Sequence, residues 1–172
     1  MIKKANAFTI VELLIVIVVI AILAAISIVA YTGIQDRAKA SRIISMYNSV
    51  DKAFRLVGSD KGWATWPTDG SFGLGGNPTL TAIAGTADFS NYLQASVVPV
   101  DTNFRYDNDN DTYNGCSVGG LGVSIYTQTT VSRTIAEQVD KSIDDGNLSC
   151  GKVTWNTSNS EFKIYLSFGQ GM

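Results

Sequence analysis

An unbroken apolar run near the amino terminus limits what this chain can fold into more than any other feature. Between Leu13 and Tyr31 the only polar residue is Ser27, and no charged residue lies between Glu12 and Asp36. As an α-helix this run would extend about 28 Å, close to the roughly 30 Å hydrocarbon core of a bilayer. We therefore predict a transmembrane segment at about residues 13–31.

The charges around this run predict its orientation. Lys3 and Lys4 precede it, and the positive-inside rule places that end in the cytoplasm. The rest of the chain is therefore expected outside the cytoplasm. The net charge of the whole chain, −2, does not favour broad attraction to nucleic acid. The absence of histidine excludes His-based triads and His metal sites.

Glu12 is the unusual residue, because it stands directly before the apolar run. A charge in a bilayer costs about 2.5–3.5 kcal/mol on insertion scales, and such residues are usually functional. A secretory signal peptide with a cleavage site near Ala25–Ser27 is one alternative interpretation, and an ordinary single-pass anchor is another. Neither alternative explains Glu12.

The helical pattern continues beyond the membrane-length run. Within residues 36–57 the apolar side chains recur at steps of three and four, which predicts one stripe on a helix: Ile43, Met46, Tyr47, Val50, Phe54 and Val57. Gly58 is the expected end of this helix. We therefore predict one helix over residues 8–58, whose first half is apolar all round and whose second half has one face to bury.

The segment "ANAFTIVELLIVIVVIAILAAISIVAY" resembles the amino terminus of type IV pilins and type II secretion pseudopilins. The shared features are a short basic leader, a small residue before Phe8, and Glu12 four residues after Phe8. In that family a membrane peptidase cuts before the phenylalanine and methylates the new amine. The resemblance implies a leader over residues 1–7, cleavage between Ala7 and Phe8, and N-methylation of Phe8.

The resemblance also implies a role for Glu12, which in the family pairs with the amino-terminal amine of a neighbouring subunit during assembly. Assembly in the family uses a platform membrane protein and a cytoplasmic ATPase. Two positions depart from the usual pattern: Ala7 stands where glycine is common, and Val29 stands where many members have proline. We therefore expect cleavage, and leave open whether Ala7 slows it and whether the helix melts between Ser27 and Gly33.

Residues 59–172 are expected to form a small exported domain. Residues 59–103 are rich in turn residues and are predicted to connect the helix to a sheet, with a short helix at Asp88–Ala95. Strands are predicted within residues 104–172, at "NFRY", "GVSIYTQ", "KVTW" and "EFKIYLSF", with a short amphipathic helix between the second and third. The fold class is therefore α+β, a long helix packed on a small antiparallel sheet in the lollipop arrangement of type IV pilins.

Three features of this domain have alternative interpretations. Asp107, Asp109 and Asp111 alternate as calcium ligands do, but Thr112 and Val118 exclude an EF-hand, so the choice lies between another calcium site and a solvated acidic turn. The aromatic side chains at 63, 66 and 72 either form a binding surface or cover the sheet and helix. Cys116 and Cys150 suit one disulfide outside the cytoplasm, worth roughly 3–4 kcal/mol, and many pilins carry one in this region.

The sequence thus predicts a structural subunit of a type IV pilus or related pseudopilus, which is inserted in the cytoplasmic membrane before it joins an extracellular or periplasmic filament. The alternative is a monomeric membrane-anchored domain that binds a ligand outside the cytoplasm. No catalytic set and no Gly-rich phosphate loop with lysine occur in the chain, so we expect neither an enzyme nor a cofactor other than calcium.

Overall fold

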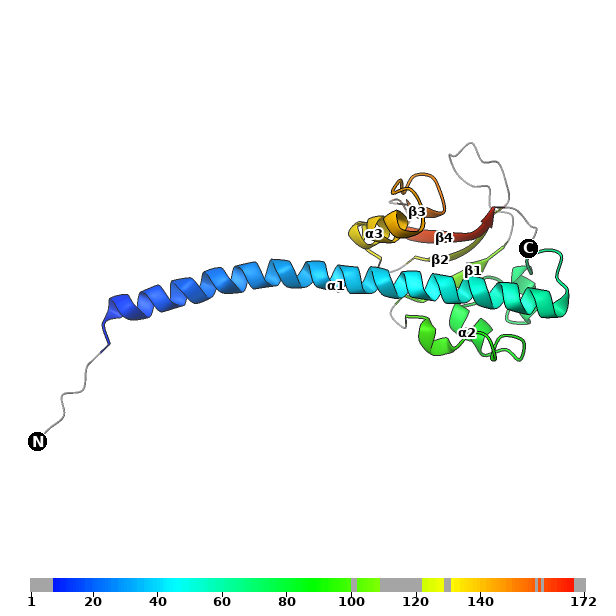
Figure 1. Cartoon of the computed structure of the whole chain (residues 1–172), viewed down its shortest axis with the longest axis horizontal. Coiled ribbons are helices and arrows are strands. Elements are labelled where there is room, and N and C mark those ends of the chain that lie inside the picture. Colours follow the sequence, from blue (N-terminus) through cyan, green and yellow to red (C-terminus); the bar gives the residue numbers. More distant parts are fainter. Residues whose placement is uncertain are drawn as a thin grey trace, which may run out of the picture. The chain divides into compact units, whose positions relative to one another are not determined.

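The computed structural model describes residues 8–99, 102–108, 122–128, 131–156, 158 and 160–168. The chain divides into two compact units, residues 1–36 and residues 37–172, and helix α1 (Ile10–Lys61) contributes to both. The second unit also holds α2 (Leu80–Ala84), α3 (Arg133–Ile143), and short 3₁₀ helices at Asp69–Phe72 and Ala95–Val97 (Figure 1). A long helix with a small sheet confirms the predicted α+β class.

In the first unit, α1 is a continuous helix through Ser27 and Gly33. The hydroxyl of Ser27 donates to the carbonyl oxygen of Leu23 at 2.7 Å, so this polar group is satisfied by its own helix. Side-chain to backbone bonds of this kind are how Ser is tolerated in apolar helices. The helix is therefore continuous in the single chain, which agrees with valine at position 29 in place of a helix-breaking proline.

In the second unit, α1 buries one face. Every residue of the predicted stripe is buried, which confirms the periodicity argument, and Ala40 and Ala53 extend the same face. The helix ends three residues later than predicted, because Gly58 is helical and Gly62 takes the left-handed conformation at φ 66°. The N–H of Trp63 donates to Gly58 O, and that of Gly62 to Ser59 O, which is a Schellman ending.

Four antiparallel strands form one sheet in the order β1-β2-β4-β3. Their bounds are Arg105–Asp107 for β1, Gly122–Thr127 for β2, Val153–Asn156 for β3 and Glu161–Phe168 for β4. The strands β3 and β4 form the predicted hairpin, with Val153 opposite Ile164. In Figure 1 the carboxy-terminal part of α1, drawn in cyan, lies along this sheet.

Both edges of the sheet are bonded to other segments of the chain. At β1, the N–H of Tyr106 donates to Pro78 O and the N–H of Leu80 donates to Phe104 O, both at 2.9 Å. At β3, the N–H of Trp155 donates to Leu148 O at 3.2 Å. Backbone groups that edge strands usually leave open are therefore used within the domain.

The region between α1 and the sheet is more ordered than a connecting loop. The hydroxyl oxygen of Thr79 caps α2 by accepting the N–H of Ala82. The predicted helix at 88–95 is wrong, because this stretch folds into turns before the 3₁₀ helix at Ala95–Val97. The aromatic side chains of the region pack around Phe54 and Phe89, which confirms the structural interpretation over a binding surface: Trp63, Trp66, Phe72 and Tyr106.

Candidate functional site

The first turn of α1 holds Glu12 in a reciprocal arrangement with Thr9. The backbone N–H of Thr9 donates to Glu12 Oε2 at 2.9 Å, and the Thr9 hydroxyl donates to the same oxygen at 2.8 Å. In return, the N–H of Glu12 donates to Thr9 Oγ1 at 3.2 Å. This is a capping box, in which the residue before the helix and the third helical residue satisfy each other's backbone donors.

The capping role of Glu12 is a function that the sequence analysis missed. The signal was present, since "TIVE" at residues 9–12 has the Thr-x-x-Glu spacing of a capping box just before an apolar helix. The cap uses only one carboxylate oxygen. Among the described residues, Oε1 of Glu12 makes no hydrogen bond, and the side chain is exposed. The carboxylate is therefore oriented by its own chain and still open to a second partner.

An exposed apolar surface follows this cap. Large aliphatic side chains from Ile10 to Ile34 remain about half or more exposed on all sides of the helix. Fully burying one Val, Leu or Ile side chain is worth about 1.5–3 kcal/mol, so the surface as a whole represents on the order of tens of kcal/mol. Within the described residues, α1 is the one helix long and apolar enough to cross a membrane. Such a surface requires lipid or other protein to cover it.

The other residues singled out from the sequence are only partly described. Ala7, Asp109, Asp111 and Cys116 lie outside the described residues. Phe8 is described and largely exposed. No free cysteine occurs among the described residues, which agrees with a disulfide at Cys150. Its pairing with Cys116 stays a prediction.

Asp107 lies at the end of β1 and takes part in a buried ion pair. Its Oδ2 accepts a hydrogen bond from Lys163 Nζ at 3.2 Å, and both side chains are more than nine-tenths buried. Next to it, the amide of Asn108 donates to Pro67 O at 2.8 Å, and its backbone N–H donates to Asp69 Oδ1. Asp107 thus links β1 to β4, while Asn108 links the end of β1 to the residues around the first 3₁₀ helix. Calcium binding by the predicted triad remains a prediction.

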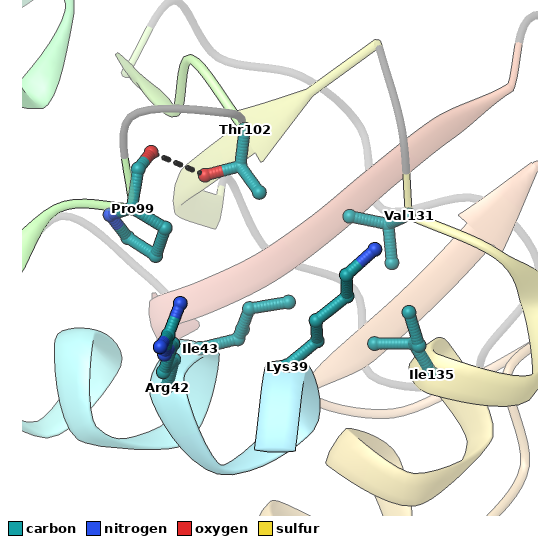
Figure 2. A pocket seen from close by; sticks show the side chains of 7 residues that line it. All are labelled: Lys39, Arg42, Ile43, Pro99, Thr102, Val131 and Ile135. Carbon is teal, nitrogen blue, oxygen red and sulfur yellow. Dashed lines mark hydrogen bonds between the residues drawn. The ribbon is translucent and has the colours of Figure 1, made fainter. Parts of the chain in front are cut away.

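A small pocket opens beside α1 in the second unit (Figure 2). Lys39 and Arg42 stand at it together with the apolar side chains of Ile43, Val131 and Ile135. Thr102 donates its hydroxyl to Pro99 O at 2.8 Å on the opposite wall. These lining side chains include two cations and no anion.

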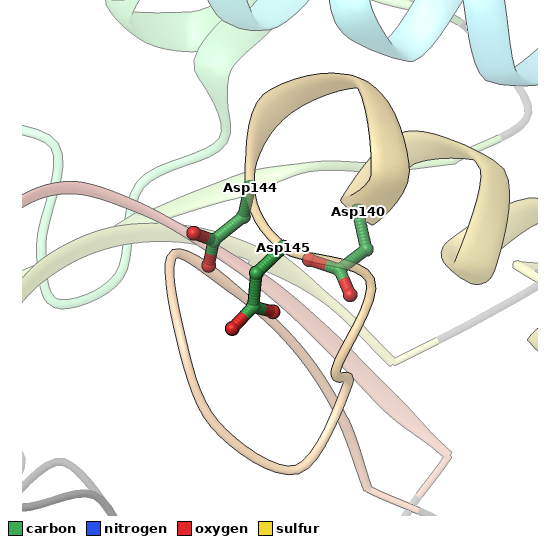
Figure 3. Close-up of side chains that lie close together, drawn as sticks. All are labelled: Asp140, Asp144 and Asp145. Carbon is green, nitrogen blue, oxygen red and sulfur yellow. The ribbon is translucent and has the colours of Figure 1, made fainter.

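Three aspartates gather at the carboxyl end of α3 (Figure 3). One carboxylate oxygen from each of Asp140, Asp144 and Asp145 lies within 4.8 Å of the others. Asp140 is completely buried, while the other two are exposed. Burial, and then the charges of Asp144 and Asp145, raise the pKa of Asp140 to about 6. The sequence analysis did not include Asp140, although its spacing of four from Asp144 places both on one face of a helix.

Taken together, the cap and the apolar helix fit a membrane-anchored precursor whose helix begins just behind a short basic segment. A family model described as the prokaryotic N-terminal methylation motif matches residues 2–28. The match confirms the resemblance seen in the sequence, and it indicates a type IV pilin-like or pseudopilin precursor. No curated protein and no solved structure matches the chain.

Proposed function

We propose that this chain is a structural subunit of a type IV pilus or a related pseudopilus. The observation that carries the proposal is the exposed, membrane-length part of α1, which begins with the Thr9–Glu12 cap inside the methylation motif. Before assembly the bilayer covers this surface, with the amino end in the cytoplasm and the domain outside. In the filament the same surface packs against equivalent helices of other subunits.

Processing precedes assembly in this proposal. The prepilin peptidase cuts between Ala7 and Phe8 and methylates the new amine, as the motif implies. Cleavage creates a positive amino group one residue before Thr9, at the same depth as Glu12. A platform membrane protein and a cytoplasmic ATPase then move the processed subunit into the polymer.

Glu12 acts as a registry device in the growing filament. Thr9 holds Oε2, which leaves Oε1 to accept the amine of a neighbour's Phe8. A buried ion that loses its partner costs about 3–5 kcal/mol, so a subunit entering at the wrong height is disfavoured. The cap makes the pairing between subunits more specific, because it limits the directions in which the Glu12 carboxylate can point.

The test is mass spectrometry of filaments sheared from cells that express this chain. We expect the chain in the polymer with an amino terminus at Phe8 that carries one methyl group. A start near Ile28, or an intact Met1, would contradict pilin-type processing. Correct processing without any chain in the sheared fraction would support the alternative, a membrane-anchored monomer that binds a ligand.

A further inference from the structure

We propose that Asp140, Asp144 and Asp145 bind a calcium ion that fastens the carboxyl end of α3 to the segment leading into β3. The three carboxylates come from two adjoining elements, the last turn of α3 and the residues that follow it. Figure 3 shows Asp140 and Asp145 reaching toward the same space, with Asp144 beside them. This site is separate from the Asp107 turn and does not depend on filament assembly.

The burial of Asp140 is the strongest indication of a ligand. Its side chain is completely buried, yet neither Oδ1 nor Oδ2 has a hydrogen-bond partner among the described residues. Buried carboxylates normally have a hydrogen-bond donor, a cationic side chain or a metal ion beside them. No Lys or Arg of the described residues forms an ion pair with any of the three aspartates. A bound cation would supply the missing partner.

The position of the cluster at the carboxyl end of α3 also favours a bound cation. The carboxyl end of a helix carries a partial negative charge, so acidic side chains are disfavoured there and cations are favoured. Asp144 is the residue at the helix end, and its backbone N–H donates to Asp140 O. Three carboxylates therefore add to the negative end of the α3 dipole. A divalent cation would reduce both the repulsion among the three carboxylates and their repulsion by the negative end of the helix dipole.

The ligand set favours calcium over magnesium, because magnesium keeps several of its waters and is usually bound by only one or two carboxylates. Two oxygens on one calcium ion, each about 2.3–2.6 Å from it, can lie up to about 4.6–5.2 Å apart. The carboxylate oxygens here lie within 4.8 Å of one another, so a single calcium ion could contact all three. Water and backbone carbonyl groups commonly complete calcium coordination.

The segment after α3 already holds the two exposed carboxylates in place. The N–H of Lys152 donates to Asp144 Oδ2, and the N–H of Asn147 donates to Asp145 Oδ1. Gly151 allows this approach, because a Cβ at that position would overlap the Asp144 carboxylate. Each exposed aspartate keeps one oxygen for an ion. Binding would therefore stiffen the path from α3 to β3 with little rearrangement.

The experiment measures thermal unfolding of the full-length chain in detergent by intrinsic tryptophan fluorescence. The protein is first freed of metal with a chelator, and 5 mM calcium or magnesium chloride is then added. Extracellular calcium sites typically bind with dissociation constants of about 10⁻⁴–10⁻³ M, so we expect calcium to raise the Tm by about 3–8 °C. Magnesium is expected to raise it by less.

Variants locate the site. The double change Asp144→Asn with Asp145→Asn should reduce the calcium shift to below about 1 °C. Asp140→Asn should also abolish it, yet melt no lower than the original chain without metal, because it removes a buried charge. Asp51→Asn, a change of the same type on α1 outside the cluster, should keep the full shift. The absence of a calcium shift in the original chain, or a full shift in the double variant, would overturn the proposal.

Discussion

The two parts of α1 share the same helical backbone, but they differ in how their apolar side chains are covered. Residues 37–61 present one apolar stripe, and the domain of the same chain covers it, so that Met46, Val50 and Phe54 have no exposed area. In residues 10–36 the apolar side chains surround the helix and nothing in their own unit covers them. A partly apolar helix can be satisfied within one chain, whereas a helix that is apolar all round needs a membrane or other chains.

The largest expected effect comes from Glu12, on the uncovered part. Glu12→Gln keeps a capping partner for Thr9, since Gln also serves in a capping box, but removes the charge. We expect the yield of sheared filaments to fall at least about tenfold, because each subunit loses an ion pair worth several kcal/mol. The membrane-retained pool should increase.

The matched variant is Thr9→Ala, which removes the hydroxyl and keeps the charge. It should lower filament yield much less than Glu12→Gln. If the two variants assembled equally well, or if Thr9→Ala were the worse, the cap rather than the charge would be the essential function of Glu12. Immunoblots of sheared and membrane fractions, with each variant as the only copy, provide the comparison.

On the covered part, Phe54→Ala should destabilise the domain by about 3–5 kcal/mol, because it empties the centre of the aromatic cluster. Leu14→Ala removes a side chain that is about half exposed, and it should leave domain unfolding unchanged. Urea unfolding of the full-length chain in detergent, followed by tryptophan fluorescence, measures both. Equal losses would mean that the two parts of α1 are stabilised together.

The predicted disulfide concerns the domain alone. Cys150→Ser should lower the free energy of unfolding by about 2–4 kcal/mol, the usual worth of a bridge that closes a loop of this size. Membrane insertion of α1 should not change. Alkylation of the original chain under denaturing, non-reducing conditions should label neither cysteine, and labelling of both would refute the pairing.

The smallest expected effect is at a helix cap inside the domain. Ser132 begins α3 by accepting the N–H of Ile135 on its hydroxyl oxygen. Ser132→Ala should therefore reduce domain stability by about 1 kcal/mol. Ser142→Ala, also on α3 but with its hydroxyl bonded to Gln138 O, is the control and should change stability by less. A larger effect at 142 than at 132 would contradict the capping argument.

Sequence patterns found what depends on periodicity and missed what depends on burial. The stripe on α1 and the strands β2 and β4 follow from repeats of side-chain type, so they were predictable. The helix end was not, because Gly58 carries the strongest local signal, whereas the left-handed backbone at Gly62 decides the outcome. Asp140 looks like an ordinary polar residue until its burial and its two neighbouring carboxylates are known.

The occupied edges of the sheet have a consequence for crowding. In the proposed filament, copies of this domain would stand side by side at very high local concentration, a condition in which open strand edges template one another and aggregate. Here β1 is bonded to residues 78–80, and β3 is bonded to Leu148. Neighbouring domains would therefore meet through side chains and not by extending a common sheet. In this proposal the subunits polymerise through α1, while the bonded sheet edges limit aggregation between neighbouring domains.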